Sequence, residues 1–494
     1  MKIEKALVPF LACAALAGCS LLPSVGPDYE EPDVEIPELP LPDAGAPATN
    51  TLAGGEFKIA GPGEDLRASI TTNDVREWWA KFNDDILTGL LERSVTNNLS
   101  FLMAQDRLMQ ARWSLLGACA AFLPKVDASA SAIRLERGRN TSSMWTSRKK
   151  LHQDVFSAGF DASWEIDIFG GARRATEAAW AEAEAAGWSF ADAWVSLTAE
   201  VASDYVALRT VQSRIAVARK NLLLQKETYE ILKSRLDSGI GDELAVNQSK
   251  YVMDQTHAAI PPLLAEETAL KDALAILAGE MPGALDDLLS GVPDRDWLVR
   301  PAKLDDTPVD MIRSRPDVRV AERKLAAQVA RVGVAKSMWY PKLYINGTLG
   351  FESVHPSKLF NRDSLTGSIG PSISWPIFRG GSIYANIKTE EAKMDEAVLA
   401  YELAVQKAAA EVRDAYSSYT QEYHRYAALQ GAVKAAGDAV AISRDLYKNG
   451  LRDFTAVIDA QRSLLSLEES LAVSRGQITV RLIALYKALG GGVL

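Results

Sequence analysis

The chain has 494 residues, of which 48% are hydrophobic and 24% are charged, and its formal net charge is −10. There is no basic excess to meet phosphates, which argues against a nucleic-acid partner. No apolar run of about 18 residues follows the N-terminal segment, which excludes an ordinary membrane-spanning helix there. Nothing divides the chain into compact units of about 100–200 residues, so its length predicts an elongated structure.

Residues 1–18 are predicted to be the signal peptide of a lipoprotein. Two lysines precede a short apolar core, and Leu16-Ala17-Gly18-Cys19 has the small residues and the cysteine of a bacterial lipobox. Cys19 is therefore expected to become the mature N-terminus and to carry covalent diacylglycerol and an N-acyl chain. Ser20 stands where an aspartate would favour the inner membrane, so we expect the lipid in the outer membrane. The alternative is an ordinary secretory signal with a chance cysteine.

The cysteine count is compatible with this assignment. Cys13 leaves with the signal peptide and Cys19 carries lipid, so Cys119 is the one thiol that remains. The mature chain can therefore form no internal disulfide. Glycine and alanines surround Cys119, which predicts a small packing residue.

The lipidated leader, residues 19–73, contains many prolines, which rule out a helix. It is predicted to be an extended segment that lies along another surface or stays mobile. A first repeat, residues 74–280, follows. Apolar residues at helical spacing begin at Trp78 and predict a helix that runs to about Phe122.

Strict alternation of apolar and polar residues then predicts two strands, at about 125–134 and 155–167. Each strand would present one apolar face and one polar face. The loop between them, residues 134–150, is basic. Contact with anionic lipopolysaccharide and a plain solvated loop are both open interpretations of it.

A heptad seam predicts a long helix from Arg173 to Leu236. Its period of 3.5 residues is typical of a left-handed supercoil. At about 1.5 Å per residue the helix would be roughly 95 Å long, so it must lie against other helices. The seam positions are Trp194, Leu197, Val201, Asp204, Leu208, Val211, Ile215, Ala218, Leu222, Gln225, Tyr229, Leu232 and Leu236.

The same seam recurs 211 residues further on, where only Glu422 and Ser443 among the equivalent positions are polar. The chain therefore contains the long helix twice, and an internal repeat of this size determines the fold.

Ser238-Gly239 is predicted to end the first long helix. A return helix is predicted from Asp242 to about Ala278, and Pro261-Pro262 is expected to kink or interrupt it. Residues 281–307 are predicted to form a connector that contains glycine, proline and aspartate.

The second repeat, residues 308–490, follows the same order. A helix is predicted over 308–339, and alternation predicts strands at about 342–353 and 364–376. The second long helix is predicted to end at Asn449-Gly450, and a last helix completes the repeat.

The length and pattern of the strands indicate a membrane. Each has about 10–12 residues, close to the roughly 9–11 that a tilted transmembrane strand needs. Four strands cannot close a barrel, and lipid does not tolerate an open sheet edge. The expected fold is therefore an α+β membrane protein, a tandem repeat of long coiled-coil helices plus β-hairpins. Its homotrimer would form a 12-stranded β-barrel and a 12-rod α-helical barrel. A soluble sheet packed on helices is the alternative.

Short motifs follow one another along the chain in a specific order. They are Cys19 with Gly26-Pro27-Asp28-Tyr29, Trp78-Trp79, Arg315-Pro316-Asp317-Val318, Tyr340-Pro341-Lys342, Trp375-Pro376-Ile377-Phe378 before Gly380-Gly381, and Asn449-Gly450 with Asp459-Ala460-Gln461-Arg462. In this order the chain resembles the TolC-like outer-membrane factors, specifically their lipoprotein branch of OprM- and NodT-like efflux proteins. The resemblance covers essentially the whole chain.

The resemblance implies a homotrimeric exit duct of a tripartite efflux system. The duct would be lipid-anchored in the outer membrane and extend into the periplasm. A periplasmic adaptor (membrane fusion) protein and an inner-membrane pump of the RND type would dock on it and supply drugs or other solutes. The family does no chemistry and needs no cofactor besides the lipid, and the sequence contains no HExxH, GxSxG or phosphate-binding glycine loop.

The resemblance also implies a periplasmic gate at Asp459 and Arg462, because the Asp and Arg of this motif hold the tips closed in similar proteins. The two residues are spaced i, i+3 on one helix face. An exposed surface pair that contributes roughly a few tenths of a kcal/mol is the alternative. The aligned positions in the first repeat are Gln248 and Tyr251, so one hairpin per protomer would hold this gate.

Adaptor docking is expected at the two helical turns, in segments that resemble the grooves that adaptors contact. The residues concerned are Arg235, Gly239, Leu446 and Gly450. A structural role is the alternative, since both glycines can end a helix and Asp242 and Asp453 can begin the next. Both roles can hold together.

Two other functions remain open at this point. One is a type I protein-secretion duct. The other is a non-conducting, lipid-anchored periplasmic coiled-coil scaffold, which would not need two-faced strands of membrane length. The sequence does not identify the exported cargo.

Overall fold

The computed structural model describes residues 24–32, 78–136, 152–291 and 309–491. The predicted signal peptide, Cys19, most of the leader, most of the 134–150 loop and the second part of the connector lie outside the described residues. The chain divides into two compact units. The first comprises Met1–Asp33, Arg107–Gly187 and Val320–Tyr401, and the second comprises Val34–Asp106, Trp188–Arg319 and Glu402–Leu494.

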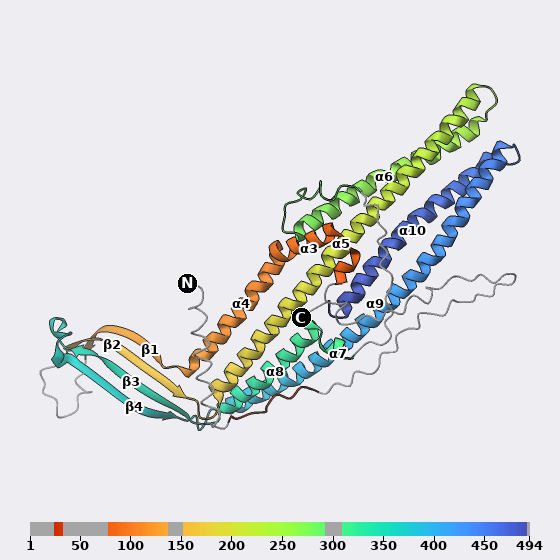
Figure 1. The fold of residues 1–494 in the computed structure, drawn as a ribbon. Coiled ribbons are helices and arrows are strands. Elements are labelled where there is room, and N and C mark those ends of the chain that lie inside the picture. The colour runs from red at the N-terminus through yellow and green to blue at the C-terminus, as the bar shows by residue number, and fades with distance from the viewer. Residues whose placement is uncertain (1–23, 33–77, 137–151, 292–308, 492–494) are drawn as a thin grey trace. The chain divides into compact units, whose positions relative to one another are not determined.

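The first unit contains one antiparallel sheet of four strands, in the order β1-β2-β3-β4 (Figure 1). The strands are β1 (Lys125–Glu136), β2 (His152–Ile166), β3 (Lys342–Ser353) and β4 (Leu365–Ser374). β1 ends later and β2 begins earlier than the alternation predicted. Because β2 pairs with β3, the two repeats contribute to one sheet and β1 and β4 form its edges.

The two faces of the sheet differ in chemistry. On one face Phe160 and Leu349 pair across β2 and β3, and each is 59% exposed. On the other face Ser163 Oγ donates to Asn346 Oδ1 at 2.9 Å, and Asn346 Nδ2 donates to Ser372 Oγ at 2.8 Å. The alternation therefore separates an apolar surface from a hydrogen-bonded polar surface, and this chain buries neither of them.

Residues 24–32, the described part of the leader, pack against helices of the first unit. Asp28 forms an ion pair of 2.5 Å with Arg174, whose side chain is 4% exposed. The Tyr29 hydroxyl donates to the carboxylate of Glu322 at 3.1 Å. This part of the leader therefore lies along another surface, which was one of the two predicted outcomes.

Two long helices and two return helices form the repeat. α5 (Gly171–Asp237) and α9 (Ser382–Lys448) have 67 residues each, and α6 (Glu243–Leu277) and α10 (Phe454–Ala488) have 35 each. At about 1.5 Å per residue the long helices measure roughly 100 Å. Every position of both predicted seams is buried or partly buried. Among the described helices, none combines the length and the apolar character needed to cross a membrane.

α6 continues through Pro261 and Pro262, so the interruption that was one of the two predicted outcomes is not observed. Both prolines are exposed, and so are His257 and Ala258, four residues earlier. The carbonyls of these two residues lose their usual N–H donors to the prolines. Water can reach them, which explains why the helix tolerates the pair.

The predicted helix up to Phe122 is broken at Asn98, which separates α3 (Asp85–Asn97) from α4 (Leu99–Cys119). Asn98 has an extended backbone. Its side chain accepts from Phe101 N at 2.9 Å and donates to Leu277 O at 3.0 Å. It therefore begins the second helix while it contacts the end of α6.

A similar break divides the predicted 308–339 helix into α7 (Val309–Arg313) and α8 (Pro316–Ser337). Pro316 has no backbone N–H to continue α7, and its fixed φ suits the first position of a helix.

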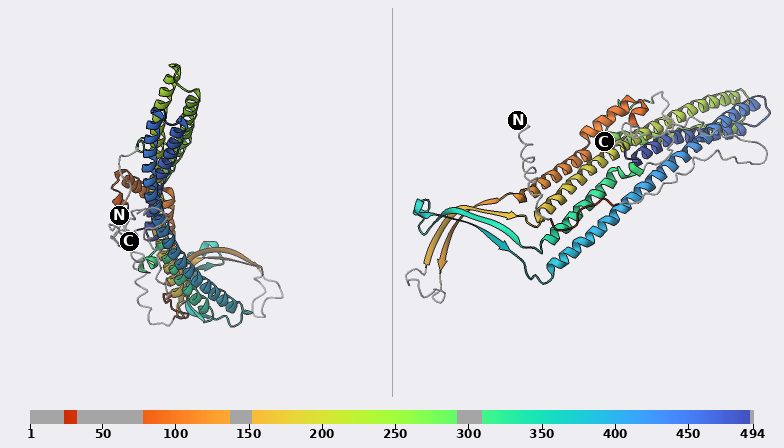
Figure 2. Two further views of the ribbon diagram at one scale, coloured as in Figure 1. Left: turned by 90° about the vertical axis from the view of Figure 1, so that its right-hand side faces the viewer. Right: turned by 60° about the horizontal axis from the view of Figure 1, so that its bottom comes forward.

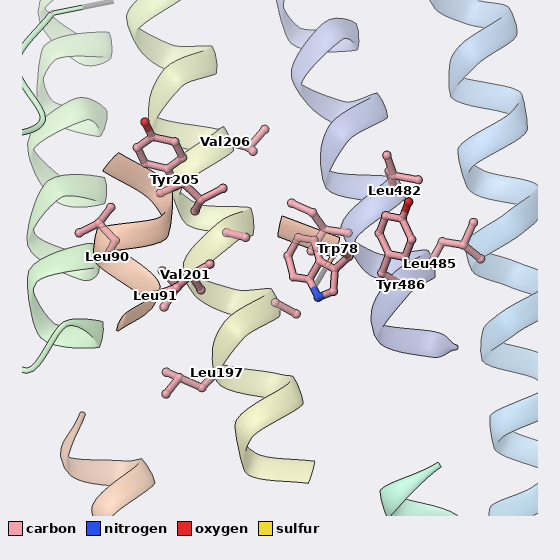
Figure 3. Packing of buried hydrophobic residues seen from close by; sticks show 14 of the residues in the cluster. Trp78, Leu90, Leu91, Leu197, Val201, Tyr205, Val206, Leu482, Leu485 and Tyr486 are labelled. Carbon is pink, nitrogen blue, oxygen red and sulfur yellow. The ribbon is translucent and has the colours of Figure 1, made fainter. Parts of the chain in front are cut away.

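The second unit has a large apolar core between α3, α5 and α10 (Figure 3). Trp78 is 1% exposed and its ring stacks on Tyr486 with the centroids 5.8 Å apart. Leu285 and Leu289 join this core at 1% and 0% exposure. The described part of the predicted connector is therefore packed.

Candidate functional site

The first hairpin turns at Gly239, which has a φ of +75°. Gly239 N donates to Leu236 O at 2.9 Å, and Ile240 N donates to Arg235 O at 3.1 Å. This is a Schellman cap, which satisfies the last carbonyls of α5. Asp242 then begins α6, because its side chain accepts from Leu244 N at 2.9 Å.

The second hairpin repeats this geometry. Gly450 has a φ of +71°. Gly450 N donates to Tyr447 O at 3.0 Å, and Leu451 N donates to Leu446 O at 2.9 Å. Asp453 occupies the N-cap of α10 without a side-chain hydrogen bond to the helix, unlike Asp242. The two turns can thus act as capped, rigid tips at equivalent positions of the repeat.

An apolar cluster joins the two hairpins close to these turns, and the tips lie side by side in Figures 1 and 2. Its buried members are Leu232, Ala245, Val246, Val252, Phe454, Val457 and Ile458, with Tyr229, Leu236 and Tyr447 packed against them. The hairpins of one protomer therefore share a small core near the tips.

Two arginines lie over tyrosine rings of the opposite hairpin. The Arg462 guanidinium carbon is 5.0 Å from the centroid of the Tyr251 ring, and that of Arg235 is 5.9 Å from the Tyr447 ring. Each such contact at an exposed site contributes about 0.5–1 kcal/mol. Asp459 is exposed on α10, and between the described side chains of Asp459 and Arg462 there is no ion pair.

The structure thus gathers all the predicted tip residues in the second unit and adds two tyrosines to them. Tyr251 is the residue that the sequence aligns with Arg462, because it lies 211 residues earlier and occupies the equivalent position of the repeat. Nothing in the sequence indicated that equivalent positions would touch.

The Arg315-Pro316-Asp317 motif lines a cavity of about 350 Å³ in the second unit. Arg315 donates to Asp317 at 2.8 Å, to Glu411 at 2.6 Å and to Ala488 O at 2.7 Å. Asp192 also lines this cavity, and burial, followed by the charge of Asp317, raises its pKa above the ordinary aspartate value. The motif therefore ties the start of α8 to the end of α10.

Paired helices of about 100 Å, a sheet with one bare apolar face and two capped tips define a tandem-repeat channel fold. The outer membrane efflux protein family matches residues 90–279 and 307–491. The chain belongs to this family.

Individual relatives agree with this assignment. Nodulation protein T of Rhizobium leguminosarum bv. viciae is 29% identical over 436 residues, which cover 87% of this chain and 87% of the relative. Outer membrane protein OprJ of Pseudomonas aeruginosa is 27% identical over 487 residues, or 98% of this chain and 95% of OprJ. The solved structure of the outer-membrane channel OprN has a TM-score of 0.81 and 31% identity, and the match covers 94% of this chain and 99% of that chain. The protein is an outer-membrane efflux channel that extends into the periplasm.

Proposed function

We propose that three copies of this chain close into the conducting duct. The bare apolar face of the sheet supports the proposal best, since Ile369 and Ile373 on β4 are 84% and 73% exposed. Such a face is stable against lipid tails. Lipid does not tolerate the free edges of β1 and β4. Pairing β1 of one copy with β4 of the next removes every edge, and three copies supply twelve strands and a 12-rod helical barrel.

Cross-linking and conductance test the trimer. Single cysteines placed on the outer edges of β1 and β4 are expected to cross-link three copies in outer membranes. The purified protein is expected to form discrete ion channels in a planar bilayer. A monomer that inserts without conductance would contradict the proposal.

We infer that a periplasmic adaptor docks at Arg235, Gly239, Leu446 and Gly450 and connects the duct to an inner-membrane pump of the RND type. The two tips expose equivalent turns, as a ring of docking sites requires. A photo-reactive residue at Lys448 is expected to capture this adaptor in cells. Capture of the adaptor of an ATP-driven exporter would indicate protein secretion instead. Capture of no envelope protein would favour a scaffold.

We further propose Asp459 and Arg462 as residues of the periplasmic gate. Both lie on α10 and are exposed near the tip. Asp459→Ala with Arg462→Ala is expected to raise single-channel conductance. Unchanged conductance in a trimer that inserts normally would remove both residues from the gate.

We propose that Cys19 carries covalent lipid and that the protein has no other non-protein group. We also propose that the channel lets solutes pass without catalysing a reaction. The lipobox before Cys19 supports the lipid. Cells fed labelled palmitate are expected to label the wild-type protein and a Cys119→Ser control. Cys19→Ser is expected to lose the label. Label that persists in Cys19→Ser would contradict the assignment.

A further inference from the structure

We propose that the loop between β3 and β4, residues 354–364, binds the phosphorylated glycolipid of the outer leaflet, lipopolysaccharide. Lys358 and Arg362 bind the phosphates of its lipid A, and Phe360 lies among the acyl chains. The proposal rests on the proposed duct, in which the apolar face of the sheet meets lipid. It adds a specific lipid partner at the outer end of that duct.

The loop lies at the end of the sheet that points away from the helices (Figure 1). β3 follows α8, which ends at Ser337, and β4 precedes α9, which begins at Ser382. The connection between the two strands therefore occupies the opposite end of the sheet. Because the helices of this channel extend into the periplasm, the loop reaches the outer leaflet, whose glycolipid is anionic.

The apolar face of the sheet stops just before this loop. On β3 it runs from Leu343 to Phe351, about nine residues, which is the length that a tilted strand needs to cross the hydrocarbon. Phe351 lies opposite Leu365 of β4. On β1 and β2 the same face ends in a charged pair, because Arg134 lies opposite Asp154. These charges mark the level at which hydrocarbon gives way to headgroups.

Phe360 continues the apolar face into the loop. Its ring lies edge-on against Phe351 with the centroids 5.7 Å apart, and it is still 74% exposed. Hydrogen bonds close the loop around the ring. Ser364 Oγ donates to Lys358 O at 2.8 Å, and Asn361 N donates to the same carbonyl at 3.1 Å. An exposed aromatic ring fixed at this level gains stability when acyl chains cover it.

A cation lies on each side of this ring in the sequence. Lys358 and Arg362 are both exposed and are each two residues from Phe360. Within the described residues neither has an ion-pair partner, although Asp363 directly follows Arg362. A guanidinium binds phosphate through two parallel N–H bonds, and an ammonium binds it as a point charge. The order of cation, ring and cation thus fits a headgroup with two phosphates above acyl chains.

The experiment titrates the full-length lipidated protein in detergent with diphosphorylated lipid A and counts bound lipid by native mass spectrometry. We expect saturable binding of one lipid A per chain. Lys358→Gln with Arg362→Gln is expected to weaken binding roughly 30-fold, since each cation near an anionic lipid surface contributes about fivefold. Lys358→Arg keeps the charge and is expected to bind like the wild type. Lys324→Gln with Lys407→Gln, at exposed sites of α8 and α9, removes the same charge and is the matched control.

Two further measurements separate the phosphates from the acyl chains. Monophosphorylated lipid A is expected to bind the wild type about fivefold more weakly than the diphosphorylated form. Phe360→Ser is expected to weaken both lipids by about tenfold or more, because the ring no longer removes apolar surface from water. Phe360→Leu is expected to retain most of the affinity.

Each contrary result has a separate meaning. Unchanged binding by the Lys358 and Arg362 double variant would overturn the phosphate site. An equal loss in the Lys324 and Lys407 control would assign the binding to overall charge and overturn it as well. Equal affinity for phosphatidylglycerol would refute the choice of a diphosphorylated glycolipid. A protein that conducts in a planar bilayer but fails to bind lipid A contradicts this proposal alone, whereas a protein that forms no trimer contradicts the duct.

Discussion

Trp164 and Trp375 lie 211 residues apart, and each closes the base of one strand pair with the same hydrogen bond. The Trp164 indole donates to Phe122 O at 2.9 Å, just before β1. The Trp375 indole donates to Trp339 O at 3.0 Å, just before β3. Equivalent tryptophans thus join the end of the second strand of each pair to the chain that enters the first.

Replacing both tryptophans with phenylalanine tests these bonds, because phenylalanine keeps the ring and removes the donor. Each lost hydrogen bond is expected to cost about 0.5–1.5 kcal/mol. The temperature at which the trimer dissociates in detergent is therefore expected to fall. Trp113→Phe, at a side chain that is 63% exposed on α4, is the control and is expected to change little. If Trp113→Phe lowers the dissociation temperature as much as the double variant does, the indole N–H groups of Trp164 and Trp375 do not stabilise the trimer.

Asp192 makes stability depend on pH. Burial first, and then the charge of Asp317, raises its pKa. A carboxyl whose pKa is higher in the folded state holds its proton more tightly there, so its stabilising contribution is present at low pH and is lost as pH rises through the folded-state pKa. At about pH 7 the ionised group opposes folding. Asp192→Asn is therefore expected to raise the unfolding temperature, with the gain shrinking near about pH 4.

Asp414→Asn provides the matched control for this pH experiment. Asp414 lines the same cavity but is exposed. We expect its variant to change the unfolding temperature little at either pH. A lower unfolding temperature for Asp192→Asn near pH 7 would show that attraction to Lys487 outweighs burial.

Gly450 offers a way to separate capping from docking. Asparagine tolerates the left-handed backbone that Gly450 adopts, and an added Cβ would meet no atom within 4 Å. Gly450→Asn is therefore expected to keep the trimer and to reduce export of a fluorescent efflux substrate from cells. Gly450→Val strains the backbone and is expected to impair both. Gly431→Asn, on the α9 surface, is expected to leave export intact. Normal export by Gly450→Asn would restrict Gly450 to capping.

Tyr29→Phe tests the docking of the leader. It removes the hydroxyl that donates to Glu322, a residue that is 1% exposed. Loss of a hydrogen-bond donor to a buried carboxylate is expected to reduce the free energy of docking of the leader by about 1–3 kcal/mol. Limited proteolysis is expected to cleave residues 24–32 faster in this variant. Tyr384→Phe, at an exposed tyrosine of α9, should not change the rate. Equal rates in wild type and Tyr29→Phe would show that the hydroxyl does not hold the leader.

Features that depend on one stretch of chain could be predicted from the sequence. The heptad seam placed α5 and α9, because its period follows from residues along a single helix. Breaks between helices are harder. The break at Asn98 depends on the carbonyl of Leu277, which is distant in the sequence. Pro261 and Pro262 each remove one backbone hydrogen bond from α6, which predicts a kink or a break. The helix continues because both prolines are exposed and water can reach the carbonyls that lose their donors, and the sequence does not show this exposure.

The candidate site shows the same division. Gly239 and Gly450 indicated the turns because each turn needs a residue with positive φ. The placement of Arg462 over Tyr251 depends on how two hairpins meet, and no local pattern encodes it. The offset of 211 residues identifies Tyr251 and Arg462 as equivalent positions, but equivalence within a repeat does not predict contact.

The equal lengths of α5 and α9 restrict how this duct can change in size. A deletion of seven residues from α5 alone would move its tip by about 10 Å and take Tyr251 away from Arg462. The same deletion from α5, α6, α9 and α10 together would preserve each pairing and shorten the reach into the periplasm. Natural length variants are therefore expected to gain or lose the same number of heptads in all four helices. The number of heptads would then match the depth of the periplasm that the duct has to cross.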